Sequence, residues 1–296
     1  MSTRLTLTAI AAALAMIATA IALAACNSSD GPGKGDRTCS DTSGVPELQD
    51  DSILTVGSTL NFEPITFVDA ETAAPSGLDV DLASALARSL CAEVEFVTID
   101  FGDLIKAVNA DEFDVIMSGM TITDKRSQSV DYVSYARVGT AILVRDGNPT
   151  EARGLADLCG LAVAVQRDTI QVDQLEQQDL DCALTPEGPI DILLFDTTRQ
   201  AVTDLTTAGS DAAITDFPAA FVATKESNGR LELLEEQIEP LPYGIGVRND
   251  STALNSSLSD ALDGLACSKE YEQTLEKWNL GTSTIFADFD YDACPD

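Results

Sequence analysis

The side chains that could perform chemistry in this chain of 296 residues are restricted, because it contains no histidine. Without imidazole it can form neither a Ser-His-Asp nor a Cys-His nucleophilic site, nor a zinc site built on histidine. An enzyme with this sequence would therefore use carboxylates, Lys, Tyr or Cys. The glycine-rich run at 31–35 follows no strand and lacks the spacing of a phosphate-binding loop, so no cofactor is expected.

The charge of the chain excludes further partners. Lys and Arg total 17 against 49 Asp and Glu, which gives a formal net charge of −32. Such a surface repels phosphate backbones and anionic lipid headgroups. Neither nucleic acid nor electrostatic membrane docking is therefore expected. The run at 288–292 has alternating carboxylates like the start of an EF-hand loop, but it lacks the central Gly and the distal Glu, so no metal site is expected either.

Residues 5–25 form an almost uninterrupted apolar run, long enough to span a bilayer as an uncleaved anchor. The run ends in Leu-Ala-Ala-Cys at 23–26, which resembles the lipobox of bacterial lipoproteins. This resemblance implies a signal peptide over 1–25 and acylation of Cys26, palmitate included, as the first mature residue. Residues 26–49 then read as a flexible tether rich in Ser, Asp, Gly and Pro. We therefore expect an exported protein, anchored to the outer face of the cytoplasmic membrane.

Six cysteines remain after Cys26, and an even number in an exported chain indicates disulfides. They are Cys39, Cys91, Cys159, Cys182, Cys267 and Cys294. No CxxC spacing is present, which argues against a metal cluster or a thioredoxin-like redox pair. Free buried thiols are the alternative.

From residue 52 onward, short apolar strands alternate with helical stretches. Strands are expected at 53–56, 94–98, 113–117, 162–165, 192–195 and 211–214. Helices are expected around Leu82, Leu86 and Leu90, over 103–110, and from about 169, 197 and 217, with a final helical segment ending at 277–278. Turn-rich stretches at 145–149 and 239–244 divide this series. The alternation predicts α/β sheets in two lobes, joined by two chain crossings, with ligands beyond the strand ends.

Several motifs occur in a characteristic order. They are Gly-Leu-Asp-Val-Asp-Leu at 77–82, Asp-Phe-Gly-Asp-Leu-Ile at 100–105, the run 113–126, Val-Asp-Tyr at 130–132, then 157–160, 163–166, 211–218, 243–247 and Lys277-Trp278. Over about residues 50–281 this set resembles the family 3 extracellular solute-binding proteins, the amino-acid receptors of ABC importers. The resemblance implies a two-lobed periplasmic-binding-protein-like fold of type II, with two hinge crossovers. Lobe one would comprise 50–139 and 241–285, lobe two 140–240, and the tail 286–296.

The resemblance also implies how a zwitterionic ligand would be held. Arg126 occupies the family's position for clamping the ligand carboxylate, which a planar guanidinium does better than an ammonium. Asp216, from the other lobe, occupies the position that binds the ligand ammonium. Asp is equally favoured there as the N-cap of the helix that begins near Phe217.

The other ligand positions implied by the family fall on Thr59, Phe62, Phe101, Ser118, Gly119, Thr121, Gln166, Thr169 and Ile170. Backbone N–H groups near Gly119 and the Thr121 hydroxyl would complete the donors to the carboxylate. Phe62 and Phe101 would flank the ligand's side chain, although aromatic residues also serve as core. Asp168 stands where many relatives carry Gly, which leaves the conformation of the second-lobe loop open.

The expected function is capture of a small zwitterionic solute, an amino acid, by a monomer that delivers it to an ABC permease. The alternative is an exported enzyme of the cyclohexadienyl (prephenate/arogenate) dehydratase type, with Glu63 as its one nominated carboxylate. Relatives selective for basic amino acids carry Asp where this chain has Thr59. Glu63 and the net charge would favour a cationic ligand, but the choice of amino acid stays open.

The two lobes also restrict the disulfides. Lobe two would contain only Cys159 and Cys182, and a bond from either to lobe one could restrict closure, so these two should pair. Three connectivities remain for the other four cysteines. The one with the least chain travel is Cys39–Cys91 with Cys267–Cys294.

Overall fold

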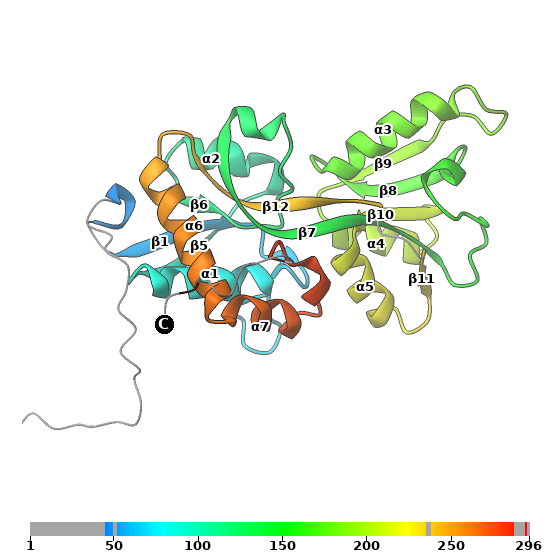
Figure 1. Cartoon of the computed structure of the whole chain (residues 1–296). Helices are drawn as coiled ribbons and strands as arrows, with labels where there is room; N and C mark the ends of the chain where they lie inside the picture. Colours follow the sequence, from blue (N-terminus) through cyan, green and yellow to red (C-terminus); the bar gives the residue numbers. More distant parts are fainter. Residues whose placement is uncertain (1–44, 50–51, 235–237, 287–293, 295–296) are drawn as a thin grey trace, which may run out of the picture. The chain divides into compact units, whose positions relative to one another are not determined.

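The computed structural model describes residues 45–49, 52–234, 238–286 and 294 of the chain (Figure 1). The expected signal peptide, Cys26, Cys39 and the beginning of the tether lie outside the described residues. None of the described helices is long and apolar enough to cross a membrane. The expected tether extends too far, because Val45 and Leu48, on either side of the short 3-10 helix Pro46–Leu48, are buried in the first hydrophobic core.

One large sheet runs through the described chain in the strand order β5-β1-β6-β12-β7-β10-β8-β9, with β11 paired to β7. Its strands are β1 (Ile53–Ser58), β5 (Glu93–Thr98), β6 (Val115–Ile116), β7 (Val130–Arg145), β8 (Ala162–Gln166), β9 (Asp191–Phe195), β10 (Ala212–Asp216), β11 (Leu231–Leu233) and β12 (Ile238–Arg248). Strands β5, β1 and β6 pair in parallel, as do β9, β8 and β10. The antiparallel pair of β7 and β12 joins these two parallel halves.

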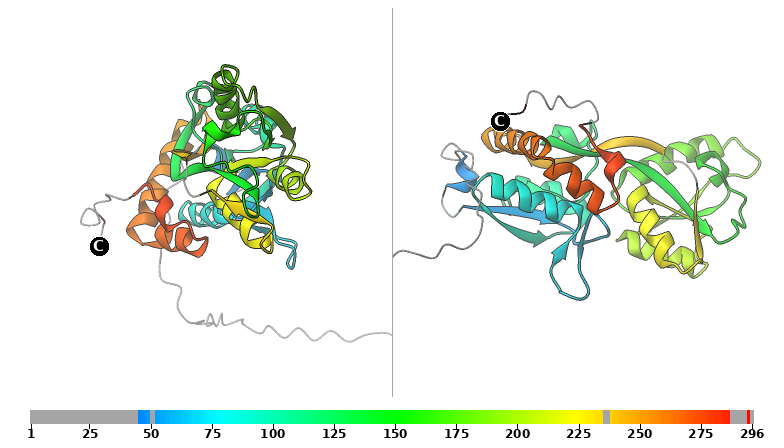
Figure 2. Two further views of the ribbon diagram at one scale, coloured as in Figure 1. Left: turned by 90° about the vertical axis from the view of Figure 1, so that its right-hand side faces the viewer. Right: turned by 60° about the horizontal axis from the view of Figure 1, so that its bottom comes forward.

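The helices are α1 (Leu78–Ser89), α2 (Leu104–Asn109), α3 (Ile170–Cys182), α4 (Thr198–Thr206), α5 (Phe217–Glu226), α6 (Thr252–Cys267) and α7 (Glu270–Lys277). A small second sheet contains β2 (Asn61–Phe62), β3 (Thr66–Val68) and β4 (Pro75–Ser76). Every helix and strand expected from the periodicity is present, although some ends differ by a few residues. Figure 2 shows the α1, α6 and α7 helices gathered around one half of the sheet.

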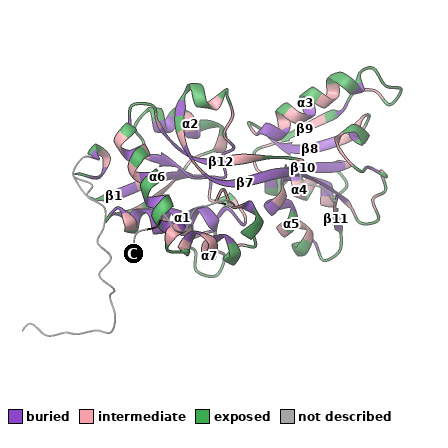
Figure 3. Cartoon of the chain, in the orientation of Figure 1, coloured by how far each residue is buried: buried purple, intermediate pink, exposed green. Residues whose placement is uncertain are grey.

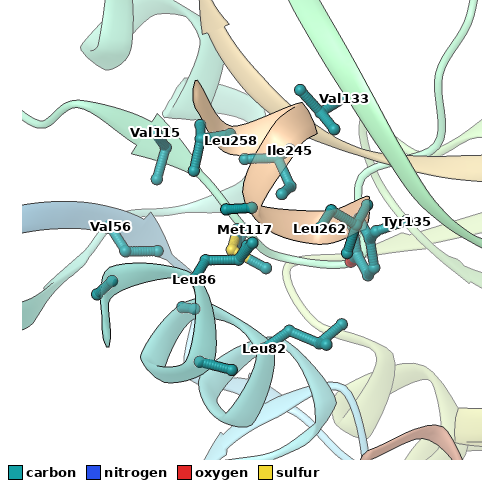
Figure 4. Close-up of a cluster of buried hydrophobic side chains, with 14 of the residues drawn as sticks. Val56, Leu82, Leu86, Val115, Met117, Val133, Tyr135, Ile245, Leu258 and Leu262 are labelled. Atoms are coloured by element: carbon teal, nitrogen blue, oxygen red, sulfur yellow. The ribbon is translucent and has the colours of Figure 1, made fainter. Parts of the chain in front are cut away.

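Leucines at four-residue intervals explain the position of α1. Leu82 and Leu86 are fully buried and pack in one core with Met117, Ile245 and Leu258 (Figure 4). Burying one such side chain contributes about 1.5–3 kcal/mol to folding. Along the sheet, buried residues run from one lobe into the other (Figure 3).

Two sets of hydrophobic cores identify the two lobes. Strand β7 contributes Val138 to the first lobe's core and Ala141 to the second lobe's core. Strand β12 runs beside it, with Ile238 against the second lobe's core and Tyr243 in the first. The chain therefore crosses between the lobes on two neighbouring strands, β7 and β12 (Figures 1 and 2).

The turn expected at 239–244 is wrong, because these residues belong to β12. Proline lacks the N–H that a strand ladder uses and is tolerated at bulges. The pairing of β12 with β7 shifts register between Ile238 and Leu241, and this irregularity accommodates Pro240. A segment that reads as a turn therefore forms a strand crossing.

Disulfides join Cys159 to Cys182 and Cys267 to Cys294, the pairs expected from the sequence. The first lies within the second lobe, and the second ties the tail to the end of α6. Cys91 is also disulfide-bonded. Its expected partner, Cys39, lies outside the described residues, so that pairing stays a prediction.

Candidate functional site

The loop after β6 brings several of the expected ligand residues together. β1 and β6 are parallel neighbours, so both end at the same edge of the sheet. The Thr59 N–H donates to Ser118 Oγ, and Ser118 Oγ donates to Thr59 Oγ1, each over 3.1 Å. Both residues are buried, as is Thr121. The structure thus places Thr59 and Ser118 in direct contact, hydrogen-bonded to each other.

Gly119 has a different role from the one expected. Its N–H donates to Asp79 Oδ2 over 2.8 Å and is therefore engaged by the protein itself. Its φ of +60° is in the left-handed region that favours glycine. A Cβ atom at this position would lie 3.1 Å from Phe62 Cε1, so the missing side chain also lets the Phe62 ring pack against the loop.

Arg126 opens the 3-10 helix Arg126–Gln128 and reaches across to the other lobe. Its Nη1 donates to the Thr121 carbonyl over 2.8 Å, and its Nη2 donates to the Asp168 carbonyl over 2.9 Å. The guanidinium lies 5.4 Å from the centre of the Phe101 ring. A guanidinium has five N–H donors, so these two contacts leave it capacity to bind a carboxylate.

Burial lowers the pKa of Arg126, and the charges of Asp216, Asp173 and Asp168 act in the opposite direction. Arg126 and Asp216 influence each other, since Arg126 also acts to lower the pKa of Asp216. Two opposite charges, one from each lobe, therefore share one desolvated region.

Asp216 is the last residue of β10 and is buried. Its Oδ2 accepts a hydrogen bond from the Tyr243 hydroxyl and its Oδ1 accepts one from Gln171 Nε2, each over 2.7 Å. It precedes α5 at the N-cap position, yet its side chain makes no capping hydrogen bond to that helix. Burial raises its pKa to about 6, against the lowering effect of the two hydrogen bonds. The carboxylate is therefore held by Tyr243 of β12 and Gln171 of α3 and does not serve as a helix cap.

Tyr243 is a site residue that the sequence did not assign. It lies on β12, which flanks β7 on one side, while β10 flanks β7 on the other. Its hydroxyl thus reaches Asp216 across β7. In the sequence, Tyr243 was marked only by its place in the motif at 243–247. No local pattern shows that β10 and β12 lie on either side of β7.

A second buried carboxylate lies under the loop that carries Gly119. Asp79 Oδ1 accepts a hydrogen bond of 2.6 Å from the Tyr135 hydroxyl. The rings of Tyr135 and Tyr243 are 6.0 Å apart. Burial raises the pKa of Asp79 to about 7, and its two neutral donors act to lower it. Asp79 therefore positions the loop and a tyrosine, and it too was missed from the sequence.

The loop between β8 and α3 keeps a conformation that glycine would adopt freely. Asp168 has a φ of +63°, and its side chain lies against Gly102 of the first lobe, where a Cβ would be 2.5 Å from Asp168 Oδ2. Asp tolerates this region better than most residues. Asp168 thus makes this turn possible and adds a contact between the lobes.

Gln166 and Thr169 stabilise the second lobe. Gln166 Oε1 accepts hydrogen bonds from the Thr198 N–H over 3.0 Å and from its hydroxyl over 2.8 Å, at the start of α4. The Thr169 hydroxyl donates to the Gln166 carbonyl over 2.8 Å. The side chain of Gln166 is therefore used to hold α4.

The remaining residues expected to bind ligand line two cavities. One, of about 360 Å³, is lined by Phe101, Arg126, Thr169 and Ile170 among others. The second, of about 330 Å³, is lined by Phe62 and by residues of α4 and α5. The described residues contain no group of three or more Cys, Asp or Glu placed to hold a metal ion.

Comparisons with known proteins agree with this architecture. Residues 54–282 match the family described as bacterial extracellular solute-binding proteins, family 3. The arginine-binding protein ArgT of Corynebacterium glutamicum is 27% identical over 287 residues, which cover 92% of each chain.

Three of the solved structures to which the chain is similar are of ancestral binding proteins. One is an ancestral arginine-binding protein bound to arginine, with a TM-score of 0.72 and 32% identity over 77% of this chain and 98% of that one. A second is an ancestral arginine-binding protein bound to glutamine, with a TM-score of 0.71 and 31% identity. The third is the ancestral amino acid-binding protein AncCDT-1, a precursor of cyclohexadienyl dehydratase, with a TM-score of 0.71 and 28% identity over 80% of this chain and 99% of that one. With a match over more than half its length and the two-lobed fold, the chain belongs to the bacterial extracellular solute-binding proteins of family 3.

Proposed function

We propose that this protein captures one free amino acid between its lobes and delivers it to the permease of an ABC importer. The observation that carries the proposal is the arrangement of two opposite charges from opposite lobes: Arg126 donates to the Asp168 carbonyl of the other lobe, and its charge and that of the buried Asp216 act on each other's pKa. A zwitterion presents a carboxylate and an ammonium, which are complementary to that pair. Arg126 would bind the carboxylate together with Thr121, and Asp216 the ammonium.

The remaining ligand residues receive roles according to their contacts. Phe62, Phe101 and Ile170 would form apolar walls. Thr59, Ser118 and Gly119, which are hydrogen-bonded within the first lobe, would shape the floor of the site, and Gln166 and Thr169 its second-lobe rim.

Closure on the ligand requires lobes that can move about a hinge. We place lobe one at 50–139 and 241–285, lobe two at 140–240 and the tail at 286–296, with the crossovers on β7 and β12. The lobes meet at the Arg126–Asp168 hydrogen bond, and Arg199 Nη2 lies 3.9 Å from Glu63 Oε2. A ligand that touches both lobes would favour the closed form by adding contacts that exist only there.

A thermal-shift screen of the twenty amino acids tests this function. Protein freed of bound ligand by unfolding and refolding should be stabilised by at least one of them, by about 2.7 kcal/mol at 100 times its dissociation constant. Stabilisation by none of the twenty would contradict the proposal.

The alternative function is a dehydratase acting on prephenate-like acids. The similarity to AncCDT-1, a precursor of cyclohexadienyl dehydratase, supports testing it. We propose binding without catalysis, supported by relatives that are named for binding amino acids. Incubation of the protein with prephenate, with phenylpyruvate monitored by absorbance, separates the two functions. Turnover that Glu63→Gln abolishes would establish the enzyme.

We also propose that Cys26 carries the lipid that anchors the mature chain outside the cytoplasmic membrane, and that the receptor acts as a monomer. The Cys26→Ser variant should move from the membrane fraction into the soluble envelope fraction or the medium, because a single residue provides the acylation site. Fractionation with immunoblotting measures the distribution. Retention of the variant in the membrane fraction would instead support an uncleaved anchor.

A further inference from the structure

Tyr243 is joined to both ends of the proposed binding site. Its backbone forms an antiparallel bridge with Thr121, and beside that bridge the Ile122 N–H donates to the Pro242 carbonyl over 2.8 Å. Its hydroxyl donates to Asp216 Oδ2 over 2.7 Å. One residue therefore fixes Thr121, proposed to bind the ligand carboxylate, relative to Asp216, proposed to bind the ligand ammonium.

The hydroxyl of Tyr243 is itself held in place. The side chain is fully buried in the first lobe's core, and its ring centre lies 6.0 Å from that of Tyr135. The Tyr135 hydroxyl donates to Asp79, which also accepts from the Gly119 N–H of the binding loop. Two packed tyrosines, one from each crossover strand, therefore lie beneath the site, and packing sets where the Tyr243 hydroxyl lies before a ligand binds.

Asp216 keeps the capacity to bind a ligand while it is held. A carboxylate offers about four acceptor positions over its two oxygens. Tyr243 uses one of them on Oδ2 and Gln171 uses one on Oδ1. These donors come from β12 and α3 and restrain each oxygen separately, so the carboxylate can accept an ammonium without turning.

We propose that Tyr243 is a positioning residue that acts on the ligand through Asp216, orienting this carboxylate for the ligand ammonium at a fixed distance from Thr121. The proposal rests on the proposed function and adds to it a residue that does not itself touch the ligand. A binding group that is oriented in advance loses less conformational freedom when the ligand arrives. Removal of the hydroxyl should therefore weaken binding even though the ligand loses no direct contact.

The titratable groups that face this contact come from several elements. Burial raises the pKa of Asp216 to about 6, whereas the hydrogen bonds that it accepts and the charge of Arg126 act to lower it. Burial, followed by Asp216, Tyr135 and Asp79, raises the pKa of Tyr243 well above its usual range. Tyr243 is therefore a neutral donor at neutral pH, and without its hydroxyl the pKa of Asp216 should rise.

The Tyr243→Phe variant removes one oxygen atom and keeps the ring. A titration of the ligand-free protein by carbon-13 NMR measures the pKa of Asp216, whose signal is assigned from its loss in Asp216→Asn. The pKa should rise by about one unit in Tyr243→Phe, the effect of one hydrogen bond to a charged group. The fold should persist, because a buried carboxyl that loses a donor can take up a proton, and circular dichroism checks this.

A double-mutant cycle tests whether Tyr243 acts through Asp216. The probes are the twenty free L-amino acids, and the one that stabilises the wild-type protein most is used for calorimetry at pH 7. Tyr243→Phe should weaken its binding about tenfold in the wild-type background. In the Asp216→Asn background the same substitution should change affinity by less than about twofold, because the charge that Tyr243 supports is already absent.

The control variant is Tyr271→Phe, which removes another buried hydroxyl from the same core. That hydroxyl donates to the Tyr135 carbonyl over 2.7 Å and does not contact Asp216. Tyr271→Phe should leave the pKa of Asp216 and the affinity unchanged within about twofold, even if it lowers stability.

Two results would overturn the proposal. An unchanged pKa of Asp216 in a folded Tyr243→Phe protein would show that the hydroxyl does not support this carboxylate. An equal loss of affinity in both backgrounds would reduce Tyr243 to a general support of the fold. Either result would leave the proposed function intact. Binding of none of the twenty amino acids would overturn the function itself, and the ligand-free titration would still decide whether Tyr243 supports Asp216.

Discussion

Arg126→Ala should weaken binding of the amino acid identified by the thermal-shift screen by about 2–5 kcal/mol, at least about thirtyfold. The substitution leaves the ligand carboxylate desolvated without its ionic partner. It also removes the hydrogen bonds from Arg126 to the Thr121 and Asp168 carbonyls, and the second of these joins the lobes. Both losses weaken the closed, ligand-bound form. Isothermal titration calorimetry at neutral pH measures the effect.

Two further variants identify its cause. Lys125→Ala removes an equal charge from an exposed neighbour that lines the same cavity, and it should change affinity little. Arg126→Lys keeps the charge without the planar pair of donors and should lie between the wild type and Arg126→Ala. Wild-type affinity in a folded Arg126→Ala protein would remove Arg126 from the binding site.

Asp216→Asn should produce a loss of similar size, because the ligand ammonium would lose its carboxylate. The fold should persist, since an amide can still accept from Gln171 and can donate to the Tyr243 hydroxyl, which is able to turn. Burial raises the pKa of Asp216 from 3.8 to about 6, so its ionisation destabilises the ligand-free protein as the pH rises through that interval. The variant should therefore be no less stable at neutral pH without ligand, while its affinity falls.

The same raised pKa predicts how wild-type affinity depends on pH. Below about pH 6 the carboxyl of the free protein is protonated, and the ligand must displace that proton to form its ion pair. Affinity should fall about tenfold between pH 7 and pH 5, one pKa unit below the midpoint. Asp216→Asn should show a shallower dependence, and Asp191→Asn, an exposed carboxylate of β9, should retain the wild-type dependence. An equal fall in Asp216→Asn would assign the titration to another group, such as Asp79.

The sequence by itself determined the family, the fold class and the two charged ends of the proposed site. Motif order is a one-dimensional property, so the likeness over residues 50–281 could be read directly. Apolar periodicity such as that of Leu82 and Leu86 reports which face of a helix is buried and therefore located the helices and strands. The division of cysteines between the lobes also led to the Cys159–Cys182 pair.

Only the tertiary structure decided how the charged residues are supported. The Tyr243 hydroxyl meets Asp216 because β10 and β12 flank the same strand, a pairing that no local pattern encodes. The Gly119 N–H is engaged by Asp79, which comes from a helix 40 residues earlier in the chain. Strand order, register and burial are long-range properties. They determine which donors and acceptors are already hydrogen-bonded within the protein and which pKa values shift. They also bring Glu63 and Glu226, which are distant in the sequence, to the lining of one cavity.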